Sequence, residues 1–295
     1  MTRAIAIAAL VALVVAPATL TNIACARAKT NDATPPAGAT RVVSLSPSTT
    51  EAMFAIGAGA ELVGRSRYCD YPPQALALPQ VGGYVDPNLE AILALRPDLV
   101  VGARGPAGPK LAETLASHGV ATFFPETESL AQVDAMLKAL GSKTGHDVDA
   151  DHEVARIDAR EAAIAAAVAS LPRVRVLLVF DADPIVVAGP HGFPDEMIAR
   201  AGGVNVVAEG SAYPTLGVER IMALDPDVIL DTSAAASHGA GAKIALDVPG
   251  WREVGAVKRG RVVPLTDEAV LRPGPRIDLG LLAIARALHP DAALP

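Results

Sequence analysis

Residues 89–101 read LEAILALRPDLVV, and residues 218–230 read VERIMALDPDVIL. Both stretches follow the pattern x-E-x-I-x-A-L-x-P-D and then continue as an apolar run. Apolar residues spaced three and four apart predict a short helix that the proline ends, and the apolar run predicts a buried strand. Because this helix and strand occur twice, the sequence predicts two related lobes.

Further parallels flank the two copies in the same order along the chain. An apolar segment opens each half, at residues 41–45 and at residues 174–180, and each is followed by a loop and a helix that ends near glycines. Strands that alternate with helices favour parallel sheets covered by helices on both faces. We therefore expect an α/β protein with two Rossmann-like lobes.

Residues 147–171 separate the two halves and contain no glycine or proline. They are rich in Ala, Glu and Arg, and Pro172 cannot continue a helix. A helix of this length spans roughly 37 Å. We expect a single long linker helix between an N-terminal lobe at 41–146 and a C-terminal lobe at 172–295; the alternative is a helix that packs within one lobe.

The first 28 residues have the layout of a secretory signal, with a basic start, an apolar run and small residues around Cys25. A membrane-spanning helix needs roughly 20 consecutive apolar residues, so we expect an exported protein. Two outcomes stay open: cleavage that removes Cys25, or acylation of Cys25 as a lipid anchor. Residues 29–40, rich in Thr, Pro, Ala and Gly, predict a disordered leader in both cases.

Composition and missing motifs narrow the class of protein. About 265 residues would remain in the mature chain, enough for two hydrophobic cores. The net charge of −7 gives no electrostatic basis for binding nucleic acid. A nucleophile elbow, a P-loop and an H-E-x-x-H helix do not occur, and Cys25 and Cys69 are too few for a thiolate zinc site. We expect a binding protein with no catalytic residue, no metal site and no prosthetic group; an exported enzyme is the alternative.

The tyrosines are concentrated in segments that we expect to be loops. Tyr68, Tyr71 and Tyr84 fall close together, and Tyr213 precedes the second repeat copy, each near proline or glycine. Ligands of α/β sheets bind beyond the carboxyl ends of the strands, and clefts between domains are favoured pockets. We expect Tyr68, Tyr84 and Tyr213 to form a ligand wall and Tyr71 to anchor its own loop; for each of them, anchoring within its own lobe is the alternative.

Several motifs occur together in a fixed order. They are RVVSLSPSTTE from Arg41, YCDYPP at 68–73, VGGYVDPN at 81–88, the P-D-L-V run and RPGPR at 272–276. Together they resemble the cobalamin, siderophore and haem group of periplasmic binding proteins, from about residue 41 to residue 288. The resemblance implies two α/β lobes joined by one rigid helix, a ligand in the cleft, and delivery to the permease and ATPase of an ABC importer.

Within this group the chain is most similar to the cobalamin-binding proteins. The resemblance implies cleft positions for Tyr68, Tyr84 and Tyr213, and it makes Asp267 and Arg272 polar contacts that orient the ligand. Tyr84 and Tyr213 stand where tryptophans are familiar in the group. We therefore expect cobalamin, a corrinoid, as the transported ligand of a monomeric receptor.

A ferric siderophore or haem is the alternative ligand within the group. Siderophore chelates are often anionic and call for arginines in the cleft; the candidates are Arg65, Arg67, Arg104, Arg272 and Arg276. Haem binders of the group place a tyrosine ligand at the position of Gly83, and Tyr84 or His191 is the substitute here. Whether Cys69 or His191 contacts the ligand stays open.

The two repeat glutamates, Glu90 and Glu219, occupy equivalent places at the starts of equivalent predicted helices. A carboxylate at that place stabilises a helix by a few tenths of a kcal/mol through the helix dipole. The resemblance implies a second role, in which one glutamate from each lobe meets arginines of a two-fold permease. The alternative to an importer receptor is a signalling or adhesion lipoprotein that has the same fold but delivers nothing to an importer.

Overall fold

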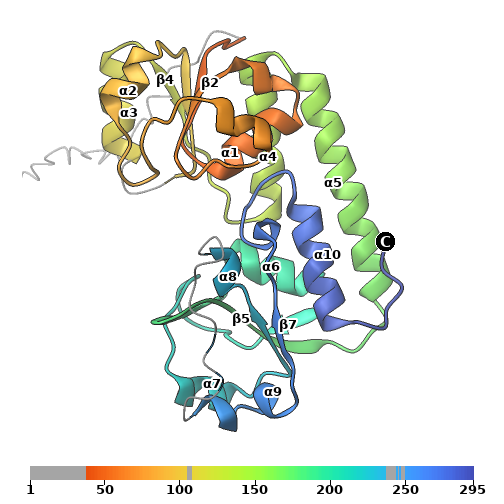
Figure 1. Ribbon diagram of the computed structural model, residues 1–295. Helices are drawn as coiled ribbons and strands as arrows, with labels where there is room; N and C mark the ends of the chain where they lie inside the picture. The colour runs from red at the N-terminus through yellow and green to blue at the C-terminus, as the bar shows by residue number, and fades with distance from the viewer. Residues whose placement is uncertain (1–37, 105–107, 237–243, 245, 247–249) are drawn as a thin grey trace, which may run out of the picture. The chain divides into compact units, whose positions relative to one another are not determined.

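The N-terminal lobe of the computed structural model is built on a four-stranded parallel sheet in the order β2-β1-β3-β4 (Figure 1). The structure describes residues 38–104, 108–236, 244, 246 and 250–295. The strands are β1 (Val42–Ser44), β2 (Leu62–Arg65), β3 (Leu99–Val101) and β4 (Ala121–Phe123). The helices of this lobe are α1 (Pro47–Ala55), η1 (Ala58–Glu61), η2 (Pro73–Ala77), α2 (Leu89–Ala94), α3 (Gly108–Ser117) and α4 (Leu130–Thr144).

The C-terminal lobe has a second sheet in the order β6-β5-β8-β9, with β7 also paired to β5. Its strands are β5 (Val174–Ala182), β6 (Ile185–Val187), β7 (Gly203–Asn205), β8 (Val228–Asp231) and β9 (Val262–Pro264). Its helices are α6 (Phe193–Arg200), α7 (Val218–Leu224), α8 (Ser233–Ala236), η3 (Trp251–Glu253), α9 (Gly255–Lys258), η4 (Glu268–Val270) and α10 (Ile277–Leu288). The predicted α/β fold class with two lobes and parallel sheets is confirmed.

One strand departs from the expected parallel pattern. β6 pairs with β5 in the antiparallel direction, because the chain reverses in a tight turn at Asp183 and Pro184. The backbone N–H of Asp183 donates to the Asp181 carboxylate at 3.2 Å and helps to hold this turn. All other pairs in this sheet are parallel, so the hairpin is an addition at its edge.

The two repeat copies make the same hydrogen bonds. In the N-terminal lobe the Asp98 carboxylate accepts from the backbone N–H of Arg41 at 3.0 Å, while the Arg41 guanidinium donates to carbonyls at the end of α2. In the C-terminal lobe Asp227 accepts from the backbone N–H of Arg175 at 3.1 Å, and the Arg175 guanidinium donates to carbonyls at the end of α7. The proline-aspartate motif therefore fastens each short helix to the first strand of its own lobe.

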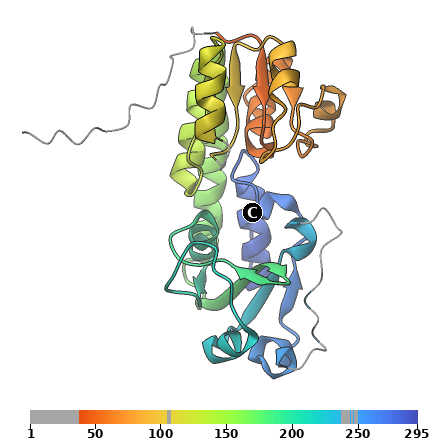
Figure 2. The same ribbon diagram turned by 90° about the vertical axis from the view of Figure 1, so that its left-hand side faces the viewer.

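Helix α5 (Asp147–Val168) follows α4 and packs against α4 and α10, as Figures 1 and 2 show. It ends three residues before residue 171, where the expected linker ends, because residues 169 and 170 form a turn ahead of Pro172. Two ion pairs join α5 to the C-terminal lobe: Arg156 with Asp278 at 2.7 Å, and Glu161 with Arg200 at 3.0 Å. Helix α5 thus contacts elements of both lobes.

The predicted signal peptide at 1–28 and most of the leader at 29–40 lie outside the described residues. Within the part of the chain that the structure describes, no helix is long and apolar enough to cross a membrane.

Candidate ligand-binding site

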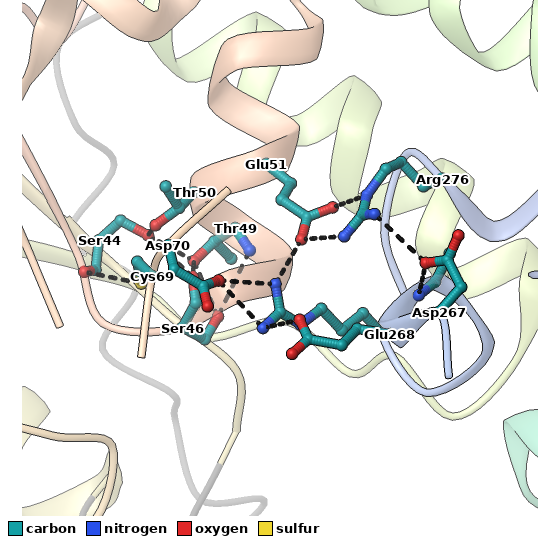
Figure 3. Close-up of polar contacts among 12 residues, drawn as sticks. Ser44, Ser46, Thr49, Thr50, Glu51, Cys69, Asp70, Asp267, Glu268 and Arg276 are labelled. Atoms are coloured by element: carbon teal, nitrogen blue, oxygen red, sulfur yellow. Dashed lines mark hydrogen bonds and ion pairs between the residues drawn. The ribbon is translucent and has the colours of Figure 1, made fainter. Parts of the chain in front are cut away.

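The loop between β1 and α1 is held by buried hydroxyl groups (Figure 3). Ser46 caps α1, and its hydroxyl also accepts from the backbone N–H of Ala103 at 3.0 Å. The Thr49 hydroxyl lies 2.8 Å from that of Ser44, and the Thr50 hydroxyl donates to Ser44 at 2.7 Å. Because these bonds join the ends of β1 and β3 to the first turn of α1, they fix the next residue of the helix, Glu51.

Glu51 is a buried carboxylate that receives two arginines from the C-terminal lobe. Its side chain is 2% exposed. Arg272 donates to Oε1 at 2.9 Å. Arg276 donates to Oε1 at 2.9 Å and to Oε2 at 2.7 Å, and Figure 3 shows its guanidinium facing Glu51. A carboxylate this deeply buried is stable in its charged form only when it is paired, so these bonds join the two lobes at Glu51.

Further carboxylates complete this ion-pair cluster. Arg272 also contacts Asp70, at 3.2 Å, and Glu268. Burial by itself lowers the pKa of Arg272, but its hydrogen bond to Glu51 and the charges of Glu268, Glu51 and Asp70 outweigh burial and raise it. Arg276 lies 3.6 Å from Asp267. Both arginines therefore remain cationic within a ring of acidic groups.

An open pocket of about 350 Å³ lies beside this cluster. Its lining residues come from loops of both lobes: Asp70, Tyr71, Thr266, Asp267, Glu268 and Arg276. The expectation that Tyr71 packs on its own lobe is wrong, because its ring lies 4.0 Å from the Arg276 guanidinium in a cation–π contact. Asp267 and Arg272 both belong to the ion-pair cluster. Asp267 pairs with Arg276, whereas Arg272 pairs with Glu51, Asp70 and Glu268.

The remaining predicted residues of the N-terminal lobe follow the carboxyl end of β2. Tyr68 is 39% exposed, and its ring lies 5.7 Å from the Arg67 guanidinium. Tyr84 is half-buried, and its hydroxyl donates to the carbonyl of Arg104 at 2.6 Å, on the loop after β3. Both rings therefore lie on loops at the sheet edge where ligands of parallel sheets bind.

Tyr213 belongs to the loop after β7, in the C-terminal lobe. Its hydroxyl donates to the Glu128 carboxylate at 3.0 Å, and its ring packs against Phe180 with centroids 5.6 Å apart. Burial first, and then the nearby charge of Glu128, raise the pKa of Tyr213. The same two causes raise the pKa of Tyr84. Glu128 is therefore bonded to Tyr213 of the C-terminal lobe, and its charge also acts on Tyr84 of the N-terminal lobe.

Sequence reasoning missed Glu51, Asp70 and Glu128 as members of this region, and it named Arg276 only as a candidate for binding an anionic siderophore. Glu51 and Arg276 stood within motifs that marked the family resemblance, and their opposite charges were the available signal. Glu128 follows the short strand β4, so its place beyond a carboxyl end was the available signal.

Cys69 and His191 differ in their access to a ligand. Cys69 is fully buried, its thiol lies 3.3 Å from the Ser66 hydroxyl, and burial raises its pKa. Cys69 is therefore part of the buried core. His191 is exposed, with a left-handed backbone (φ 66°) and a backbone N–H that donates to Asp195.

Glu90 and Glu219 are the second residues of α2 and α7, and both are exposed. Among the described residues, no three His, Cys, Asp or Glu side chains are grouped so that they could hold a metal ion.

The family described as periplasmic binding protein matches residues 42–269. The chain belongs to this family. Its members are solute receptors of transport systems, so the prediction of a binding protein rather than an enzyme is confirmed. The resemblance noted in the sequence is confirmed as well.

Relatives within the periplasmic binding proteins include two vitamin B12-binding proteins. That of Vibrio cholerae serotype O1 is 30% identical over 257 residues, covering 82% of this chain and 86% of the relative. That of Salmonella typhimurium is 32% identical over 251 residues, covering 85% and 90%.

Solved structures of periplasmic binding proteins share the fold. The vitamin B12-binding protein of Vibrio cholerae has a TM-score of 0.74 at 29% identity, covering 86% of this chain and 98% of that one. A haem-binding protein from Roseiflexus has a TM-score of 0.76 at 28% identity, covering 86% and 99%. Fold likeness therefore does not separate corrinoid binders from haem binders.

Proposed function

We propose that this periplasmic binding protein captures cobalamin and delivers it to the permease and ATPase of an ABC importer. The names of the two relatives support a corrinoid, and the tyrosines at the carboxyl ends of the strands provide flat, amphipathic contact surface. Tyr68, Tyr84 and Tyr213 form the ligand wall in this proposal.

The choice of cobalamin over a siderophore rests on how the five candidate arginines are already paired. An anionic siderophore needs accessible arginines whose charge is available. Four of the five already pair with a carboxylate, and the fifth, Arg65, is buried. The contacts are Arg67 with Asp86 at 2.6 Å, Arg104 with Glu126 at 2.7 Å, Arg272 and Arg276 with Glu51, and Arg65 with the Ser66 carbonyl at 3.0 Å.

These pairs differ in how strongly they oppose an anionic ligand. Arg67 and Arg104 are exposed, and solvent screens exposed ion pairs, so a ligand displaces their partners easily. Breaking the buried pairs at Glu51 costs about 3–5 kcal/mol, because a charge is left without a partner. A ligand with an uncharged, amide-bearing periphery avoids this cost, which favours cobalamin over a siderophore.

Haem is the second candidate, because haem-binding proteins are among the similar structures. Binding of haem iron by Tyr84 requires a phenolate. Burial and the charge of Glu128 raise the pKa of Tyr84 and oppose that ionisation, and the hydroxyl is already bonded to the Arg104 carbonyl. These contacts favour cobalamin over haem at this position.

We further propose separate tasks for Asp267 and Arg272. The Asp267 side chain is 57% exposed and lines the pocket, so it is the orienting contact for the ligand. The Arg272 side chain is only 10% exposed, and it holds Asp70 and Glu268 in place at the pocket. In this proposal the receptor is a monomer, Glu90 and Glu219 dock onto the permease, and acylation of Cys25 is the anchored form.

The proposal is tested by incubating the mature protein with cobalamin, haem and ferric siderophores in parallel and separating free ligand by gel filtration. The absorption spectrum of the protein peak identifies what is bound. We expect the corrinoid spectrum at one ligand per chain. A haem or siderophore spectrum in its place would show that the protein binds haem or a siderophore and would contradict the proposal.

A further inference from the structure

Glu128 is an exposed carboxylate in the loop between β4 and α4, at the carboxyl edge of the N-terminal sheet. Its Oε2 accepts the hydrogen bond from the Tyr213 hydroxyl, which belongs to the C-terminal lobe. A Cβ atom built on Gly192, at the start of α6, would lie 3.9 Å from the same oxygen. One acidic side chain of the N-terminal lobe is thus held against two segments of the other lobe.

The charge of Glu128 is also directed toward the proposed ligand wall. It is one cause of the raised pKa of Tyr84 after burial, so it acts on both Tyr84 and Tyr213. Its neighbour Glu126 is paired with Arg104 at 2.7 Å. Within the described part of the chain, by contrast, no cationic side chain pairs with Glu128, and its Oε1 accepts no hydrogen bond. A negative charge with a free acceptor therefore lies beside Tyr213, and this charge also acts on Tyr84.

We propose that Glu128 selects the ligand by charge, accepting hydrogen bonds from a tetrapyrrole that carries carboxamides and repelling one that carries carboxylates. This inference rests on the proposed function and narrows its ligand class. The corrin ring of cobalamin is surrounded by carboxamides, whose N–H groups donate well to a carboxylate. The propionates of haem are anionic and meet a like charge, which is how a site rejects a wrong ligand.

The test uses two pairs of ligands that differ in the charge of their peripheral groups: cyanocobalamin with its peripheral monocarboxylate, and haem with its dimethyl ester. Dissociation constants are measured for the wild type, for Glu128→Gln and for Glu113→Gln. Gln keeps an acceptor for Tyr213 and loses the charge. Glu113 is exposed on helix α3, so its substitution makes the same change in net charge outside the β4–α4 loop.

We expect the wild type to bind the monocarboxylate about tenfold more weakly than cyanocobalamin, which corresponds to about 1.4 kcal/mol. Glu128→Gln reduces this ratio to about threefold or less, and Glu113→Gln leaves it unchanged. A ratio that Glu128→Gln does not alter would overturn the inference while leaving corrinoid binding intact.

If no corrinoid binds, the proposed function fails and the haem pair decides the inference separately. The inference then predicts that haem dimethyl ester binds more tightly than haem and that Glu128→Gln removes this preference. If the wild type prefers haem to its dimethyl ester, the inference about Glu128 is overturned. If neither a corrinoid nor haem binds, both the inference and the proposed function are overturned.

Discussion

Tyr68, Tyr84 and Tyr213 present their rings from loops, and Tyr68 and Tyr213 remain 39% and 45% exposed. If these rings contact a large ligand, each substitution by Ala should weaken binding by about 1–2 kcal/mol, the usual contribution of a buried aromatic contact. The free energy of unfolding should change less, because the rings contribute little to either core. Calorimetric titration and urea unfolding measure the two quantities.

Tyr84→Phe is the matched control, since it keeps the ring and removes only the hydrogen bond to the Arg104 carbonyl. It should retain most of the affinity that Tyr84→Ala loses. Wild-type affinity in all three Ala variants would place the ligand elsewhere.

Glu51 joins two arginines of the C-terminal lobe to the N-terminal lobe. Glu51→Ala leaves Arg272 and Arg276 without their buried partner, so the free energy of unfolding should fall by about 3 kcal/mol or more. Glu113→Ala, on the exposed face of α3, should change it by less than about 0.5 kcal/mol. Equal urea midpoints for the two variants would mean that the cluster adds no net stability.

At the scale of elements, α5 carries a titratable group in its contact with α6. Glu161 is 4% exposed and burial raises its pKa to about 7, although Arg200 acts in the opposite direction. Between about pH 5 and pH 7 the native state therefore holds more protons than the unfolded chain, so the free energy of unfolding falls as pH rises. The fall from this group is on the order of 3 kcal/mol or less.

Glu161→Gln should remove this pH dependence, because the amide does not titrate and can still accept from Arg200. The variant should therefore gain stability relative to the wild type as pH rises from 5 to 8. Chemical unfolding at several pH values measures the difference; parallel curves for the two proteins would contradict the assignment.

The elements were predictable where one local pattern determined them. The repeat gave α2, β3, α7 and β8, because apolar spacing and a proline define a helix and its end within a few residues. The hairpin of β5 and β6 was not predicted, since β6 is a three-residue edge strand whose direction depends on a tight turn. The end of α5 at Val168 was missed because Ala and Ser are permitted both in a helix and in a turn.

The candidate site was only partly predictable for a related reason. The tyrosines could be singled out as loop aromatics in a chain with few aromatic residues. The Glu51 cluster joins residues more than 200 positions apart, and spacing along a sequence carries no information about such a contact. Tyr71 was misplaced for the same reason, since its partner Arg276 lies in the other lobe.

At the scale of the whole molecule, the duplicated fold offers one exposed glutamate per lobe, Glu90 and Glu219. If these meet arginines of the permease, reversing both to Lys should abolish uptake and leave the ligand affinity unchanged, because like charges would then face each other. If they only interact with their helix dipoles, each Ala variant should lose about 0.3–1 kcal/mol of stability and uptake should persist. Uptake in cells that lack their own receptor, beside titration of the purified variant, separates the two roles.

The central claim is that this two-lobed receptor holds a corrinoid, and calorimetric titration of the mature chain with cyanocobalamin tests it most directly. We expect one site per chain with a Kd below about 1 µM, equivalent to about −8 kcal/mol or tighter. Saturable binding of haem or a ferric siderophore, with no saturable heat from cyanocobalamin under the same conditions, would contradict it.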